Sequence, residues 1–207
     1  ITTVNLSKRV TPILNKATKY TIPFGNALFN PHDGHMMDTG GIVSSTGFFI
    51  SGDTNEIAYH TFASEGNSVD FGNLQGAKQT CCCVSSSTRG ISYGSGGSPY
   101  NQIDYVEIAT TGDAQDFGDM ATAKRIGAPA SSPTRGFSIS GYDDSNVVTK
   151  KEYITIASKG TGTNFGDVSV GSLACYGTSN STRAIIAAGA GPHYDSPYPR
   201  VKRIEYF

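Results

Sequence analysis

The sequence predicts an all-β fold made of four copies of one unit of about 46 residues. Strand-like segments alternate with turn formers, and no segment keeps the apolar period of a helix. A Phe-Gly pair recurs at intervals of 47, 46 and 48 residues, starting at Phe24, Phe71, Phe117 and Phe165. A Thr that Arg or Gly follows recurs in step, at Thr46, Thr88, Thr134 and Thr182. Self-similarity at this period is typical of repeat architectures.

The repeats define the expected domain organisation. Residues 1–18 carry no repeat signature, and we expect them to form an N-terminal arm that packs on a neighbour. Residues 19–207 are expected to form a single domain. Its repeats cover about residues 24–70, 71–116, 117–164 and 165–207.

Each unit is expected to contain three clear strands and a short fourth strand at the Phe-Gly turn. A four-stranded unit of this length is the size of a propeller blade, and the strand before each Thr has the small residues that an innermost strand needs. The predicted strands cover residues 37–45, 47–52, 56–63, 78–86, 90–94, 103–110, 124–131, 136–141, 150–158, 172–179, 184–189 and 200–207.

The two ends of the chain predict how the propeller closes. The last repeat stops before a Phe-Gly strand, whereas residues 24–28 supply one at the start. We therefore expect this N-terminal strand to complete the C-terminal blade, remove an open edge and close a ring of four blades. Residues 19–23 and 201–207 look like the same strand twice. Either the first lies outside the ring, or a second chain completes the ring.

The order of these parts resembles the kelch repeat. A strand ending at Gly (RGFSISG) leads to a strand with Tyr (KKEYITIA) and then to an aromatic turn. Kelch repeats carry Trp at that turn, where this chain has Phe, and their Gly-Gly doublet is only partial here. Strands of this type followed by DFGD and STRG look more like a repeat of tailed-phage structural proteins. The resemblance covers about residues 19–207 and implies a virion part, such as a tail fibre, tail tip, tail-tube terminus or decoration protein.

Composition narrows the expected partners. Charged residues make up 16% of the chain and the net charge is −1, which favours neither a nucleic-acid nor a membrane-surface partner. No apolar run approaches the roughly 20 residues of a membrane span, so no membrane insertion is expected. We expect other virion proteins and copies of the chain as partners, with a host-surface glycan as a further candidate, and we expect localisation in the virion.

Candidate residues for metal or catalytic chemistry are few. His32 and His35, with Asp33 and Asp38, have metal-ligand spacing, but they lie in one loop rich in turn formers, and we interpret them as a surface turn. His60 and His193 are isolated. The Asp-Phe-Gly triplets at 70–72 and 116–118 lack the other kinase motifs. The sequence therefore predicts no catalytic, cofactor or metal site and no enzyme.

Four cysteines are present, and three of them are consecutive. Their spacing fits neither a disulfide framework nor a zinc site. Cys81 and Cys175 each stand seven residues before their repeat's Thr, where the other copies have Thr39 and Gly127. A slot with these residues needs a small side chain, so we expect buried free thiols, with a metal or redox role as the alternative.

Arg89, Arg135 and Arg183 recur after the Thr, whereas the first copy has Gly47. We expect them along one rim, where each guanidinium binds backbone carbonyls of the neighbouring blade. The alternative is a cationic mouth for an acidic glycan or peptide.

The predicted function is that of a non-enzymatic virion structural or attachment protein. A carbohydrate-binding propeller is the alternative, since the loops 93–100, 141–146 and 193–198 have adaptable Ser, Gly and Tyr residues. A propeller enzyme such as a copper radical oxidase is the less favoured rival. It needs converging ligands, whereas the aromatics repeat with the strands as packing residues do, at Tyr59, Tyr105, Tyr153 and Tyr206.

Overall fold

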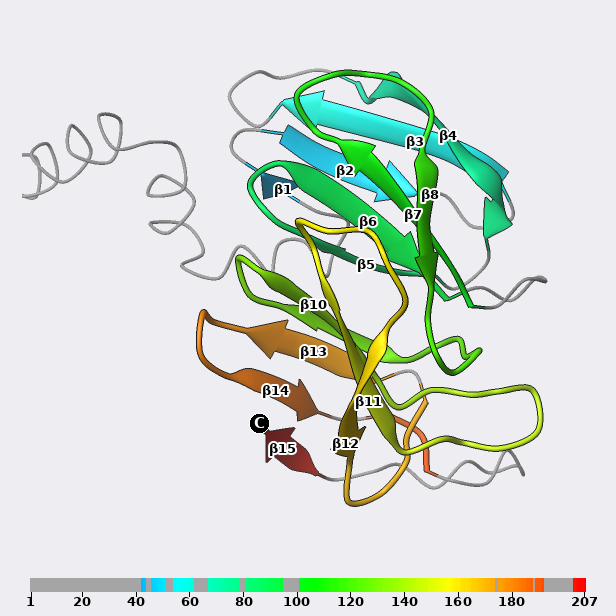
Figure 1. The fold of residues 1–207 in the computed structure, drawn as a ribbon, viewed down its shortest axis with the longest axis vertical. Coiled ribbons are helices and arrows are strands. Elements are labelled where there is room, and N and C mark those ends of the chain that lie inside the picture. Colours follow the sequence, from blue (N-terminus) through cyan, green and yellow to red (C-terminus); the bar gives the residue numbers. More distant parts are fainter. Residues whose placement is uncertain are drawn as a thin grey trace, which may run out of the picture.

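The structure is a computed structural model, and it describes residues 42–43, 46–50, 54–61, 67–78, 81–94, 101–173, 175–187, 189–191 and 203–207. Within these ranges the chain forms strands and no helix, so the predicted all-β class is confirmed. The strands form four antiparallel sheets that follow one another along the chain (Figure 1).

Each sheet is a meander in which consecutive strands are neighbours. The first sheet contains β1 (Ile42–Val43), β2 (Thr46–Ile50), β3 (Thr54–Thr61) and β4 (Val69–Lys78). The second contains β5 (Cys82–Ser85), β6 (Arg89–Tyr93), β7 (Gln102–Glu107) and β8 (Gln115–Asp119). The third contains β9 (Ala128–Ser131), β10 (Arg135–Ile139), β11 (Lys150–Thr155) and β12 (Thr163–Asp167). The fourth contains, in the described ranges, β13 (Tyr176–Ser179), β14 (Ala184–Ala187) and β15 (Ile204–Tyr206).

The strand predictions hold in position but not in every boundary. Phe71, Phe117 and Phe165 lie in β4, β8 and β12, the last strands of their sheets, as expected for the short Phe-Gly strand. For three inner strands, the predicted start lies four residues too early. The residues at those starts, Lys78, Lys124 and Ser172, bind groups of another sheet, and β5, β9 and β13 begin after them.

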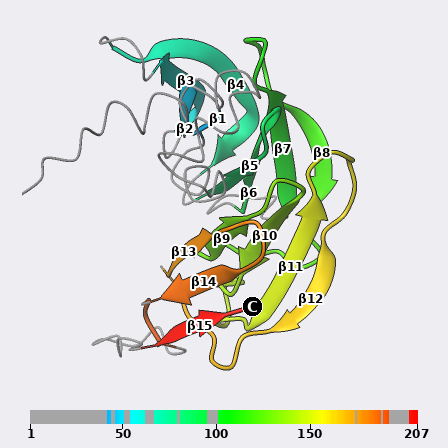
Figure 2. The same ribbon diagram turned by 90° about the vertical axis from the view of Figure 1, so that its left-hand side faces the viewer.

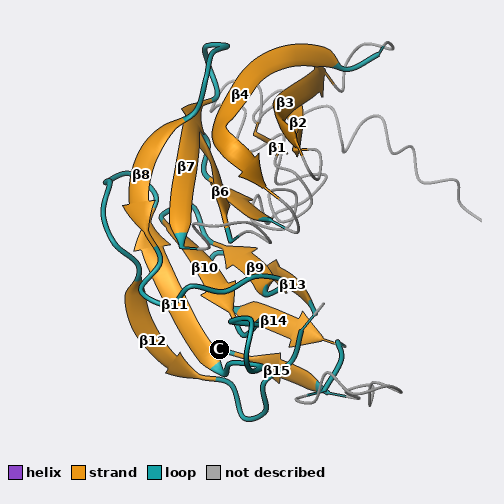
Figure 3. Cartoon of the chain, turned by 90° about the vertical axis from the view of Figure 1, so that its right-hand side faces the viewer, coloured by secondary structure: helices purple, strands orange, loops and turns teal. Residues whose placement is uncertain are grey.

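The four sheets lie side by side along an arc, with the first sheet at one end and the fourth at the other (Figures 2 and 3). The strands β5, β9 and β13 line its concave side, and β8 and β12 lie on the convex side. Neighbouring inner strands are joined directly. The hydroxyl of Ser179 accepts a hydrogen bond from the Ser131 amide and donates one to the Ser131 carbonyl. Residues 24–28, which were expected to close the ring, lie outside the described residues, as do residues 19–23 and the arm of residues 1–18.

The core lies between successive sheets rather than inside one of them. Ile57, Phe71 and Leu74 of the first sheet pack with Val106 of the second. Between the second and third sheets, Ile91, Ile103 and Phe117 pack with Ile154 and Ile156. Between the third and fourth sheets, the buried cluster joins Ala128, Phe137 and Ile139 to Cys175 and Ile186. Burial of these apolar faces supplies the main force that holds each sheet to the next.

The Asp-Phe-Gly triplets are bulges that also connect sheets. The carboxylate of Asp116 accepts a hydrogen bond from the Gly118 amide at 3.1 Å, and the register between β7 and β8 shifts beside it. Gly118 has φ +135°, and a Cβ atom there would lie 2.5 Å from the Gly160 carbonyl oxygen of the third sheet. Phe117 accepts a hydrogen bond from the Gly160 amide at 2.9 Å. Asp70 and Gly72 make the same bulge in the first sheet. The triplet therefore shapes the backbone where two sheets meet.

Candidate binding site at the Thr-Arg turns

The turn that carries Thr and Arg has the same hydrogen bonds in three sheets. In the second sheet, the Ser86 hydroxyl accepts hydrogen bonds from the amides of Thr88 and Arg89, both at 3.2 Å. Ser132 has this role in the third sheet and Asn180 in the fourth. A short polar side chain at the first turn position stabilises the turn by such bonds. Residues 180–182 have the Asn-Ser-Thr pattern of a glycosylation sequon, and the Asn180 side chain is thus part of a turn.

Each Arg at these turns lies over the Tyr of the third strand of its own sheet. The guanidinium carbon is 4.9 Å from the ring centre for Arg89 and Tyr105, and 4.4 Å for Arg135 and Tyr153. The corresponding distance for Arg183 and Tyr206 is 5.2 Å. The cation is attracted by the electron-rich ring face, which fixes the direction of the Arg side chain. The sequence analysis identified both repeated residues but not their pairing.

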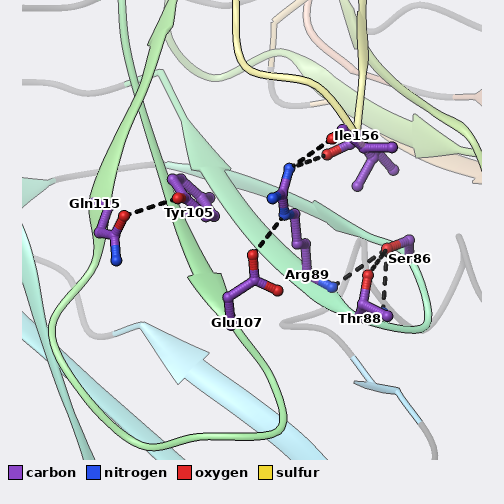
Figure 4. A network of polar contacts seen from close by, with 8 residues as sticks. Ser86, Thr88, Arg89, Tyr105, Glu107, Gln115 and Ile156 are labelled. Atoms are coloured by element: carbon purple, nitrogen blue, oxygen red, sulfur yellow. Dashed lines mark hydrogen bonds and ion pairs between the residues drawn. The ribbon is translucent and has the colours of Figure 1, made fainter.

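The Arg89 side chain binds the neighbouring sheet, as the structural interpretation predicted (Figure 4). Its Nη1 donates to the carbonyl oxygens of Ile156 and Ala157 at 3.1 and 3.0 Å, and its Nε lies 2.8 Å from Glu107 Oε1. A planar guanidinium is suited to hold several acceptors at once. The prediction is therefore confirmed for Arg89.

The guanidinium of Arg135 is not used in this way. No described residue accepts a hydrogen bond from it, and Thr155 stands where the second sheet has Glu107. The prediction of carbonyl binding is therefore not confirmed for Arg135, whose guanidinium lies over the Tyr153 ring and has no carbonyl acceptor among the described residues.

A pocket of about 340 Å³ opens at this place between the third and fourth sheets. One wall is the turn with Ser132 and Arg135, and the opposite wall is the turn with Asn180 and Arg183. Its apolar part is a cluster of rings, in which Phe137 lies 5.2 Å from Phe165 and 5.5 Å from Phe207 between centres. The remaining lining residues are Ser131, Thr134, Ser179, Ser181, Thr182 and Ala184.

The side chains that line this pocket include two cations and no carboxylate. Hydroxyl and amide groups surround the guanidinium groups, and both Arg135 and Arg183 are exposed. A ligand with a carboxylate or several hydroxyl oxygens can accept hydrogen bonds there while an apolar part contacts the Phe rings. This pocket was not predicted, because two sheets line it and a single repeat does not show which residues of the next sheet lie opposite.

Two buried lysines cross from one sheet to the next, and the sequence analysis missed them. Lys78 Nζ donates to the Gln102 carbonyl oxygen at 3.0 Å and lies 3.3 Å from the Asp104 carboxylate. Lys124 Nζ donates in the same way to the carbonyls of Ser138 and Lys150. Burial raises the pKa of Asp104, against the opposing effect of Lys78. Burial also lowers the pKa of Lys124 to about 8, against the opposing charge of Glu152. Both lysines stand seven residues after a Phe of the Phe-Gly pair, which was the available signal.

The cysteine prediction is confirmed in part. Cys82 and Cys175 are buried free thiols, whereas Cys81 and Cys83 are free but partly exposed, so full burial is wrong for these two. A hydrogen bond from the Cys83 thiol, followed by contributions from Ser92 and Lys78, lowers the pKa of Cys81 to about 7. Among the described residues, no group of three His, Cys, Asp or Glu side chains is placed to hold a metal ion.

The other candidate residues fall largely outside the described structure. His32, Asp33, His35, Asp38 and His193 lie in undescribed ranges, as does the side chain of His60. The loop 141–146 is described, and its Asp144 pairs with Arg125, which lies outside the loop, at 2.8 Å. The polar loop 193–198 and most of the loop 93–100 are not described.

Comparison with known proteins found no matching family model and no matching curated protein. In the described part of the chain, no helix has the length and apolar character needed to span a bilayer. The interpretation of function therefore rests on the repeated architecture and on the groups at the sheet boundaries.

Proposed function

We propose that this chain is a non-enzymatic structural or attachment protein of a virus particle, in which a kelch-like β-propeller serves as the assembly and binding scaffold. One observation carries the proposal. Three consecutive sheets have the same four-strand order, with a bulge before the same Phe-Gly strand in each. Each sheet is then one blade, and the repeat's resemblance to tailed-phage proteins supplies the location.

The fourth blade is completed by a Phe-Gly strand, and residues 24–28 have the required sequence. In the described residues, β15 pairs with β14 alone, whereas β7 and β11 each have a second neighbour. Tyr105 and Phe117 form an edge-to-face pair with centres 5.9 Å apart, and Tyr153 and Phe165 form another at 6.0 Å. Placed beside β15, Phe24 takes the same position toward Tyr206. The strand comes either from the same chain or from a second copy.

Purified particles of the virus that encodes the chain provide the test of location. Quantitative mass spectrometry is expected to find the chain at a fixed number of copies per particle, and antibodies against it are expected to label one substructure in electron micrographs. Absence from purified particles, despite expression in infected cells, would contradict the proposal.

The non-enzymatic part has a separate test. The purified chain is expected to show no turnover on polysaccharide or peptide substrates, with or without added divalent metal ions. Turnover that His32→Ala or His35→Ala abolishes would overturn it and would favour the enzyme alternative.

An acidic glycan is the second candidate function, and the pocket between Arg135 and Arg183 favours it. Array binding is expected for glycans with a carboxylate and not for their neutral counterparts. Loss of one charge-assisted contact in Arg135→Ala should weaken binding roughly tenfold. Arg125→Ala is the matched control, since Arg125 pairs with Asp144 away from the pocket. Equal binding of neutral and acidic glycans, or no binding at all, counts against this candidate.

A further inference from the structure

The fourth sheet has an apolar face that no described residue covers. We call the side chains of Tyr176, Ile185, Ile204 and Tyr206 the open face. Their exposed fractions are 78%, 40%, 74% and 70%. Exposed apolar groups that gather on one sheet mark an interaction surface more strongly than single exposed residues do.

Strand register shows what this face corresponds to. In the second sheet, the matching residues are Cys82, Ile91, Ile103 and Tyr105, with exposed fractions of 8%, 2%, 0% and 6%. Those residues are buried because the third sheet packs on them. The third sheet is covered in turn by the fourth, through Cys175 and Ile186. The open face is thus the side on which a further sheet of the same type packs.

The edge of the fourth sheet at β15 is also unpaired among the described residues. On the side away from β14, β15 has no neighbour in the described residues, whereas β11 pairs there with β12. An edge with free backbone groups beside an apolar face favours the addition of another β-element.

The first sheet has the backbone feature that a covering sheet requires. In the third sheet, Gly136 stands where Val84 of the second sheet approaches, and a Cβ atom on Gly136 would lie 2.5 Å from Val84 Cγ2. By register, Gly47 of β2 occupies the position of Gly136 and not that of Arg135, so the alignment expected from the sequence is wrong by one residue in the first copy. Thr178 of β13 occupies the position of Val84. The first sheet can therefore approach the fourth as closely as the third approaches the second.

Within one chain these two sheets lie at opposite ends of the arc (Figures 2 and 3). We infer that the open face binds the first sheet of a second copy of this chain, head to tail. This inference rests on the proposed propeller and names its partner. Such contacts join different patches on the two copies, so they produce a closed ring or a filament. Arg183 is then expected to reach carbonyl groups that follow β3 of the second copy, as Arg89 reaches those of Ile156 and Ala157.

Light scattering on the full chain over a concentration series tests this inference. Association is expected for the native chain, and Tyr176→Lys with Ile204→Lys should weaken it at least roughly tenfold through loss of apolar burial. Val69→Lys is the control, because Val69 is 53% exposed on β4 and lies outside the open face. Circular dichroism confirms that each variant keeps its strands. A native chain that stays monomeric, or an equal loss with the control, overturns the inference.

A photo-crosslinking residue at position 204 shows which segment covers the face. Copies labelled with heavy nitrogen are mixed with unlabelled copies, so that crosslinks within and between chains differ in mass. Crosslinks between copies that map to residues 42–61 support the inference. Crosslinks to residues 42–61 of the same copy, or no crosslinks to residues 42–61 at all, overturn it. Neither result bears on whether particles contain the chain, so the two proposals can fail independently.

Discussion

Buried charges are unusual in a chain with so few charged residues, and two of them fasten neighbouring sheets. Lys78 and Asp104 have side-chain exposed fractions of 3% and 0%, and they approach to 3.3 Å. Neither Asp104 oxygen has a hydrogen bond of good geometry among the described residues, and Lys78, followed by the Gln75 backbone, opposes the rise that burial causes in the Asp104 pKa. Its main compensation for lost hydration is therefore the charge of Lys78.

Removal of one partner is expected to destabilise the fold strongly. Lys78→Met leaves a buried, uncompensated carboxylate and should lower the free energy of unfolding by about 3 kcal/mol. Lys78→Met combined with Asp104→Leu should lose much less, since both charges are gone. Urea denaturation followed by circular dichroism measures both. Asp167→Asn is the control, because Asp167 belongs to an exposed pair with Lys150 and should leave the midpoint nearly unchanged. Equal losses in the single and double variants would contradict the role of the pair.

Lys124 predicts a pH dependence of stability. Its pKa is about 8 in the folded chain, against an ordinary 10.5, because burial disfavours the charged form. Between these values the unfolded chain binds more protons, so this residue makes stability rise with pH across that window. The stability of the native chain relative to Lys124→Met should therefore increase from about pH 8 to about pH 10.5. A constant difference across the window would show that Lys124 does not titrate there.

Among the cysteines whose thiol pKa is shifted, Cys81 is expected to be the most reactive. Its pKa of about 7, lowered first by the hydrogen bond from Cys83, leaves a large thiolate fraction at neutral pH. Burial raises the pKa of Cys175. Limited alkylation with iodoacetamide, followed by fragmentation of the peptide with Cys81–Cys83, should label Cys81 well before Cys175. Labelling of both at one rate would contradict the pKa order.

At the scale of elements, the Phe-Gly strand has two neighbours, its own third strand and the connector of the following sheet. Gly118 and Gly166 occupy the same position in β8 and β12 and both have positive φ, but only Gly118 lies under a following connector. A comparison of Gly118 with Gly166 therefore separates the cost of the positive φ from the cost of the contact between sheets.

Substitution of these glycines should have unequal effects. Gly166→Ala adds only the cost of positive φ, about 1 kcal/mol, since only Lys151 Cε lies within 4 Å of the new Cβ. Gly118→Ala also forces a Cβ to 2.5 Å from the Gly160 carbonyl oxygen, and the total loss should be about 3 kcal/mol. Thermal or urea midpoints distinguish the two. Equal losses would show that the connector moves away at little cost.

Much of the strand layout was predictable because it depends on short-range chemistry. Turn formers end the strands, and β-branched or aromatic residues occupy β7, β10 and β11, which were found where expected. Two inner strands were predicted to start at Lys78 and Lys124. In the structure these lysines precede the inner strands, and their side chains bind carbonyl groups of the next sheet. Such contacts join residues far apart in sequence, so neither they nor the pocket beside Arg135 could be read from a local pattern.

At the scale of the whole molecule, the described part of each sheet packs on the sheets next to it along the chain. Among the described residues, the second and third sheets are covered on both faces, whereas the fourth is covered on one. Stability in such a linear array is a sum of units and nearest-neighbour interfaces, so the end sheet has the lower local stability.

Hydrogen exchange should report this gradient. Amides of β14 are expected to exchange faster than those of β6 and β10 at low protein concentration, since local opening of the fourth sheet exposes one interface instead of two. Mass spectrometry of peptides covering these strands gives the rates. Association through the open face should slow β14 selectively as concentration rises. Uniform rates in all three strands would show that the array opens as one cooperative unit.

The bond from the Gly160 amide to Phe117 and its counterpart from Gly112 to Phe71 use only main-chain atoms. This main-chain part of the attachment therefore does not depend on the identity of the surrounding side chains, although apolar burial supplies the main force between sheets. A gene that duplicates or deletes one whole unit preserves these bonds at the new junction. Lineages that carry this protein are expected to differ in length by multiples of one unit, while surface loops diverge freely.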